Sequence, residues 1–269
     1  MGKRVTDFNI RLRTIRIRDL IVGIIISMIA VAILSIIFPI FYDDTDIFFI
    51  LVLSMIILYF AWCLKGTTGL SKNFEEIFVK ENTNEILYVF AVNLAFAFMF
   101  LFLIVILDFA VGMVDPTWVT GFDIDTVDLA PSAFLLSAIE GIIFAPVIEE
   151  LVFRGVLFNR LKIRIGIVPA MLISSFLFGI GHDFGGITSA FLFGICMCIL
   201  YLKTDNILIP MSVHFINNVA ATLLDMVNID AFFSQFPWII LLGIIVITAT
   251  VYLTKYIINE ISALKRVYS

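Results

Sequence analysis

Two adjacent glutamates and an arginine interrupt an otherwise apolar stretch of the sequence, Gly141–Leu161. A charged side chain at the centre of a bilayer is opposed by roughly 2.5–3.5 kcal/mol, so such residues usually have a function. Glu150 and Arg154 are four residues apart and can pair on one helix face, whereas Glu149 points about 100° away from Glu150. We therefore expect Arg154 to neutralise Glu150 and to leave Glu149 available as a general base.

The chain contains two histidines, His182 and His214, and both lie in or beside apolar segments. Asn218 follows His214 by four residues, so their side chains share a helix face. Donors without a permanent charge suit the stabilisation of an oxyanion in a dry site, although a polar contact between helices would explain the same pair. His182 ends the run Phe-Gly-Ile-Gly-His, whose glycines allow a close helix approach or a broken helix end.

The composition indicates the scaffold that must position these side chains. Of 269 residues, 62% are hydrophobic and 14% are charged, whereas soluble domains have about 45–50% and about 25%. Repeated apolar runs of helix-spanning length predict an all-α polytopic membrane protein, with residues 1–269 forming one transmembrane domain. The three cysteines fall in apolar runs and are expected to be small core residues rather than disulfide partners.

About eight transmembrane helices are predicted. In chain order they are Leu20–Phe41, Ile47–Leu64, Glu85–Leu107, Pro131–Arg164, Ile165–His182, Phe184–Leu202, a seventh from after Asp205 through Asp225, and Phe236–Ile258. With the amino terminus in the cytoplasm, all 17 basic residues fall in cytoplasmic segments and the outer loops carry only acids. The positive-inside rule therefore predicts that both termini are cytoplasmic. The basic leader, Met1–Asp19, is interpreted as an orientation signal, or alternatively as an amphipathic helix on anionic lipid.

Several other kinds of functional site are excluded because the sequence lacks the motifs that mark them. The sequence has no His-Glu-x-x-His zinc helix and no Gly-x-Ser-x-Gly nucleophile elbow. The aspartates between residues 108 and 128 lack the spacing of an EF-hand, so a solvated acidic loop is expected there rather than a calcium site.

Gly186, Ala190 and Gly194 recur at every fourth position and predict a helix-packing ridge.

Three short motifs resemble the signatures of the CPBP (Abi) family, which comprises the CAAX prenyl endopeptidases and their bacterial relatives. The motifs are Glu149-Glu150-x-x-x-Arg154, Phe178-x-x-x-His182 and His214-x-x-x-Asn218. Each motif alone is weak, but their order along a polytopic chain is specific. The resemblance covers residues 131–225, which we treat as the family core.

The resemblance implies an intramembrane peptidase and a role for each motif residue. Glu149 with His182 would activate the attacking water, His214 and Asn218 would stabilise the oxyanion, and Glu150 and Arg154 would support the site. A site without a metal or other cofactor is favoured. If the activity is that of a metalloprotease, zinc or another divalent ion would be held by Glu149, His182 and His214.

The depth of these residues in the membrane needs an explanation. Counted from Ile165, His182 lies about 25 Å across the membrane, so a fourth span that began at Pro131 would leave Glu149 near the opposite face. We therefore expect residues 131–140 to lie in the outer interface and the crossing helix to be Gly141–Leu161. The chamber would then lie near the middle of the membrane and open to the cytosol.

The expected protein is a multi-pass enzyme of the bacterial plasma membrane that hydrolyses a peptide bond of a membrane-associated peptide. Signal-peptide processing and bacteriocin self-immunity are both compatible roles. Its partners would be membrane lipids and a peptide or protein substrate, and no nucleic acid. Two alternatives stay open: a non-proteolytic membrane regulator or scaffold of the same fold, and a transporter whose intramembrane charges line a substrate path.

Overall fold

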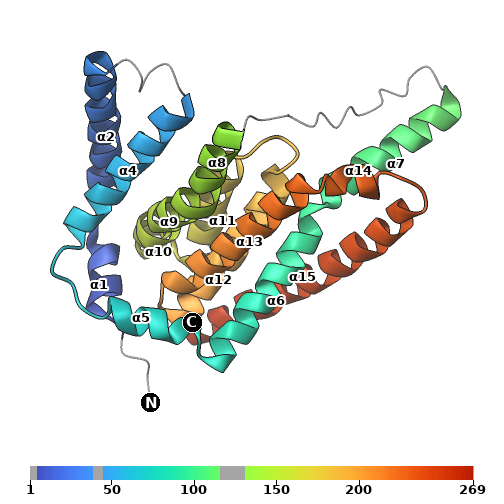
Figure 1. The fold of residues 1–269 in the computed structure, drawn as a ribbon. Helices are drawn as coiled ribbons and strands as arrows, with labels where there is room; N and C mark the ends of the chain where they lie inside the picture. The colour runs from blue at the N-terminus through green and yellow to red at the C-terminus, as the bar shows by residue number, and fades with distance from the viewer. Residues whose placement is uncertain (1–4, 39–44, 116–130, 269) are drawn as a thin grey trace.

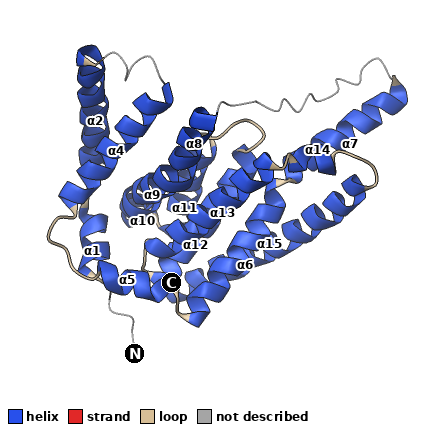
Figure 2. Ribbon diagram, in the orientation of Figure 1, coloured by secondary structure: helices blue, strands red, loops and turns tan. Residues whose placement is uncertain are grey.

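The computed structural model describes residues 5–38, 45–115 and 131–268, and every regular element within these ranges is a helix (Figures 1 and 2). This confirms the predicted all-α class. The described helices that are long and apolar enough to cross a membrane are Ile17–Ile37, Lys80–Val114, Ile187–Thr204 and Trp238–Leu264. Ile47–Cys63 and Ile167–Gly179 are shorter apolar helices. The start of the basic leader and most of the two predicted acidic loops, at residues 42–46 and 108–130, lie outside the described residues.

The amino-terminal part is a short helix followed by a helical hairpin. α1 (Asp7–Thr14) begins after Thr6, whose hydroxyl accepts a hydrogen bond from the Asn9 amide. α2 (Ile17–Ile37) and α4 (Thr45–Cys63) then pack against each other. They correspond to the first two predicted spans, shifted by one to four residues at their ends.

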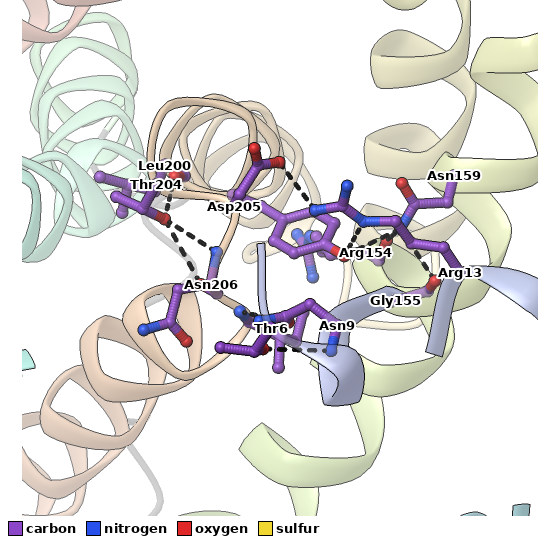
Figure 3. Close-up of polar contacts among 12 residues, drawn as sticks. Thr6, Asn9, Arg13, Arg154, Gly155, Asn159, Leu200, Thr204, Asp205 and Asn206 are labelled. Atoms are coloured by element: carbon purple, nitrogen blue, oxygen red, sulfur yellow. Dashed lines mark hydrogen bonds and ion pairs between the residues drawn. The ribbon is translucent and has the colours of Figure 1, made fainter. Parts of the chain in front are cut away.

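α1 packs on the protein core. Leu12 is fully buried. A Cβ placed on Gly155 would lie 2.9 Å from the Cδ2 atom of Leu12. On the same helix, Arg13 donates hydrogen bonds to the Tyr201 hydroxyl and to Asp205 (Figure 3). Leu12 of this leader helix therefore faces the protein, whereas Ile10 on the same helix is 51% exposed, and the lipid-bound alternative stays a prediction.

The third predicted span is a nearly continuous apolar rod. α6 (Lys80–Ala97) follows the short α5 (Leu70–Ile77) and leads directly into α7 (Met99–Val114). α15 (Trp238–Tyr268), the last helix, runs beside α6 (Figure 1).

The segment with the paired carboxylates is a single helical run that includes two π-helical stretches. Its parts are α8 (Pro131–Ile139), η2 (Glu140–Phe144), α9 (Ala145–Glu149), η3 (Glu150–Phe158) and α10 (Asn159–Ile165). In a π-helix the hydrogen bonds join residues five apart, which widens the turn. The helix boundary predicted at Gly141 is wrong, because the backbone is helical from Pro131 onward. The position of residues 131–140 in the outer interface stays a prediction.

Three further helices complete the region around this run. α11 (Ile167–Gly179) and α12 (Ile187–Thr204) pack closely together, and α13 (Leu208–Met226) follows. A short α14 (Ile229–Phe233) then leads to α15. Most side chains of α12 are buried, so α12 is the central helix of the fold.

The turn at Gly166 explains how Glu149 and His182 reach the same level. Gly166 joins α10 to α11 with φ of +86°, a conformation that glycine adopts without a steric penalty. Glu149 lies 17 residues before this turn and His182 lies 16 residues after it. In an antiparallel hairpin, residues equally far from the turn lie at the same depth. The expectation that a helix starting at Pro131 would separate the two residues is therefore wrong.

Candidate active site

A fully buried ion pair lies at the base of the site. Arg154 Nη1 is 2.9 Å from Glu150 Oε1, and neither side chain is exposed. The guanidinium carbon lies 4.4 Å from the centre of the Phe178 ring, a cation–π contact. A Cβ on Gly194 would lie 3.1 Å from Arg154 Nη2, so the predicted packing ridge of α12 also makes room for the arginine. The pairing expected from the spacing of four residues is confirmed.

The Glu150 carboxylate also fixes the orientation of His214. The Nδ1 atom of His214 lies 3.0 Å from Glu150 Oε1. Because an ion-paired carboxylate can only accept a hydrogen bond, Nδ1 carries the proton and donates it. The other ring nitrogen, Nε2, lies 3.6 Å from Glu149 Oε2. His214 therefore stands between the two glutamates, a contact that bridges 64 residues of sequence.

The side chains of Glu149 and Glu150 differ in their exposure to solvent. The Glu149 side chain is 31% exposed, whereas that of Glu150 is completely buried. Glu149 also interacts electrostatically with both His182 and His214. A reacting molecule can thus reach the Glu149 carboxylate but not the Glu150 carboxylate.

Asn218 and His182 both contact backbone carbonyl groups. Asn218 Nδ2 donates to the Gly141 oxygen over 2.7 Å, which uses one of its two amide hydrogens. His182 is exposed and follows the end of α11, and its Nδ1 atom lies 3.0 Å from the Phe178 oxygen. Since a carbonyl oxygen accepts, Nδ1 is the donor, and Nε2 is an acceptor when the ring is neutral.

Phe178 is the apolar centre around which the motif residues gather. Its ring centre lies 4.8 Å from that of His182 and 5.8 Å from that of His214. Phe153 packs edge-on against the same ring. The sequence marked Phe178 as part of a motif but gave no sign of this contact role. The π-helical stretches and the role of the Gly141 carbonyl were also missed, because neither has a sequence signature.

The alternative of a metal ion held by Glu149, His182 and His214 concerns the same side chains. Among the described residues, no three His, Cys, Asp or Glu side chains are close enough to hold a metal together. The Nδ1 atoms of His214 and His182 are bonded to Glu150 and to a carbonyl group, and each ring keeps its Nε2 atom for a further partner. The metal-free site stays a prediction, and no chemical step below is routed through a metal.

Part of the chain matches a known protein family. Residues 131–220 match the family described as type II CAAX prenyl endopeptidase Rce1-like. The resemblance to the CAAX endopeptidases is confirmed. The matching segment contains all six predicted site residues.

A curated relative supports the same class. The chain is 27% identical over 113 residues to a Bacillus subtilis (strain 168) protein named "Putative membrane peptidase YdiL". The alignment covers 42% of this chain and 45% of that protein, which is less than half of either length. No solved structure matches the chain. Together, the family and the relative support a membrane peptidase.

Proposed function

We propose that the protein is an intramembrane endopeptidase that hydrolyses a peptide bond of a membrane-associated peptide. The observation that carries this proposal is the accessible Glu149 carboxylate beside His214, whose far nitrogen is held by the buried Glu150–Arg154 pair. An acyl-transfer reaction needs a base and a stabiliser of negative charge held close together. A structural ion pair alone would not require the second, accessible glutamate.

Water activation is assigned to Glu149 together with His182. The partly exposed carboxylate of Glu149 removes a proton from a water molecule as that water attacks the substrate carbonyl carbon. His182 has its Nδ1 committed to the Phe178 carbonyl, so its Nε2 atom can accept a second hydrogen bond from the same water. The proton held by Glu149 is then transferred to the departing amine.

Oxyanion stabilisation is assigned to His214 and Asn218. Because Nδ1 of His214 already donates to Glu150, a hydrogen bond to the oxyanion must come from a protonated Nε2. His214 then acts as an imidazolium in this step. This revises the expectation of an uncharged donor. Asn218 contributes the amide hydrogen that Gly141 does not use.

An eight-helix topology with both termini in the cytoplasm is part of the proposal. α1 and the carboxyl end of α15 lie at the same lower end of the molecule in Figure 1. Ion pairs at this end join Lys203 to Glu85 and Glu260, and Arg160 donates to the Ile15 oxygen. Segments expected in the cytoplasm are thus in contact with one another. The two shorter apolar helices, the α8–α10 run and α13 would supply the four crossings beyond the four candidate spans.

The proposed location is the bacterial plasma membrane, with a peptide in that membrane as substrate. The named role of the Bacillus relative supports this choice. Processing of signal peptides and protection against bacteriocins both supply substrates of this kind.

The test compares the wild type with Glu149→Gln in liposomes that contain membrane-inserted signal peptides, with products identified by mass spectrometry. Loss of the general base should slow cleavage by about 10²–10⁴-fold. Glu81→Gln changes an exposed carboxylate on α6 and should cleave at the wild-type rate. Equal cleavage by wild type and Glu149→Gln would refute the assignment. A parallel reaction with a chelator, followed by added zinc, tests the expectation of a metal-free site.

A further inference from the structure

A cavity of about 930 Å³ lies between α1, α2 and α4, away from the residues of the candidate active site. Its walls include Val22, Ile26 and Trp62, which are 48%, 60% and 74% exposed. The cavity therefore opens to the surroundings of the hairpin and is separate from the buried Glu150–Arg154 pair. Nothing in the proposed peptidase mechanism uses it.

The two ends of this cavity have different chemistry. Arg11, Arg18 and Asp19 form a charged rim together with Thr14, whereas Ala30 and Met55 belong to the apolar part. From Arg18 to Ala30 the cavity follows α2 for 12 residues, or about 18 Å. The hydrocarbon core of a bilayer is about 30 Å thick, so this length corresponds to one leaflet.

Small residues on α2 form part of the cavity lining. A Cβ on Gly23 would lie 2.6 Å from the Tyr59 ring, so glycine lets this ring pack directly against the helix. Ser27 folds its hydroxyl back onto the Gly23 carbonyl and presents little bulk. The cavity between α2 and α4 is thus lined by small residues and by apolar side chains, and a flexible hydrocarbon chain suits this lining.

The rim carries an excess of positive charge. Arg11 uses its Nε atom to hold the Cys63 carbonyl, which leaves its terminal nitrogens free of that bond. Arg18 pairs with Asp19 and is 76% exposed. The lining therefore contains two guanidinium groups and one carboxylate, and a single phosphate group would complete the neutralisation. Arginine binds phosphate through two parallel hydrogen bonds.

We propose that this cavity binds one anionic phospholipid of the leaflet that meets α1. The phosphate lies at Arg11 and Arg18, and one acyl chain follows α2 to Ala30. Because α1 also packs on η3 through Leu12 and Gly155, the bound lipid is in contact with the helix that seals this end of the core. The proposal does not depend on peptidase activity.

The experiment titrates the delipidated full-length protein with phosphatidylglycerol, or with phosphatidylcholine of identical acyl chains, and counts bound lipid by native mass spectrometry. The wild type should bind one phosphatidylglycerol on the order of tenfold more tightly than phosphatidylcholine. Arg11→Gln/Arg18→Gln should remove this preference. The matched control, Arg164→Gln, changes an exposed arginine outside the cavity and should keep it.

A steric pair tests the acyl-chain position independently of charge. Ala30→Phe fills the cavity and should weaken binding of both lipids, whereas Ile33→Phe changes an exposed residue of α2 outside the cavity and should not. This pair still decides the question if the double arginine variant does not fold. Equal affinity of the wild type for the two lipids, or equal loss in Arg164→Gln, overturns the proposal. Unchanged binding to a folded Ala30→Phe variant, or displacement of the lipid by a signal peptide, also overturns it.

Discussion

Removing Arg154 alone should destabilise the protein far more than removing Arg154 and Glu150 together. Both side chains are completely buried, and their charged atoms are 2.9 Å apart. Arg154→Met leaves a buried carboxylate with the His214 ring as its remaining partner. Loss of one member of such a pair costs about 3–5 kcal/mol, because the desolvated charge is left without compensation.

The reverse single change should have a similar cost. In Glu150→Gln the guanidinium stays buried, and its contact with the Phe178 ring is worth roughly 2 kcal/mol when desolvated. This cation–π contact offsets only part of the stability that is lost with the Glu150 carboxylate. In the double variant, Glu150→Gln/Arg154→Met, no buried charge remains and the new amide oxygen still accepts from His214. We expect a total cost below about 2 kcal/mol, because replacing a whole buried pair is often close to neutral.

The assay is reversible unfolding in mixed micelles with an increasing fraction of denaturing detergent, followed by circular dichroism. Free energies of unfolding are compared for the wild type, the two single variants and the double variant. Arg164→Met removes an exposed arginine and should change the free energy by less than about 0.5 kcal/mol. The reasoning is refuted if Arg154→Met costs no more than this control. It is also refuted if the double variant costs the sum of the two single changes, because coupled charges cannot be additive.

Two further predictions each compare a substitution at a tightly packed residue with the same substitution, or a similar one, at a loosely packed or exposed residue. Gly194→Ala should destabilise the protein by about 1–3 kcal/mol, because its Cβ would meet the Ser175 Cβ at 2.9 Å. Gly141→Ala has open space around its Cβ and should be neutral or stabilising by up to about 1 kcal/mol in the same unfolding assay. Leu12→Ala should release α1 and cost about 2–5 kcal/mol, seen as faster hydrogen exchange in residues 7–14, whereas Ile10→Ala, 51% exposed, should not. Equal effects within either pair would contradict the packing described here.

The local features of this protein were accessible from its sequence. The all-helical class follows from apolar runs that are long enough to span a bilayer. The pairing of Glu150 with Arg154 follows from a spacing of four residues, which any helical backbone brings onto one face. The distinction between an accessible Glu149 and a buried Glu150 follows from the same geometry, since adjacent residues point in different directions.

The helix boundary at Gly141 was predicted incorrectly for a physical reason. Depth was counted from the start of the helix at Pro131, whereas the antiparallel turn at Gly166 determines which residues lie side by side. Counting away from that turn would have placed Glu149 and His182 together without moving a helix boundary. The sequence contained this information, because Gly166 separates the two apolar helices.

Tertiary structure alone decided the chemistry of His214. Its Nδ1 atom meets a carboxylate 64 residues away, and this contact determines which nitrogen can face a substrate. The packing of α1 on the core could not be predicted from the sequence either, because it joins Arg13 to Asp205 across 192 residues. A sequence fixes which side chains share a helix face, since that depends on the local backbone repeat. Which faces meet depends on long-range packing, so the hydrogen-bond partners and charge states of the site residues emerge only when the helices are assembled.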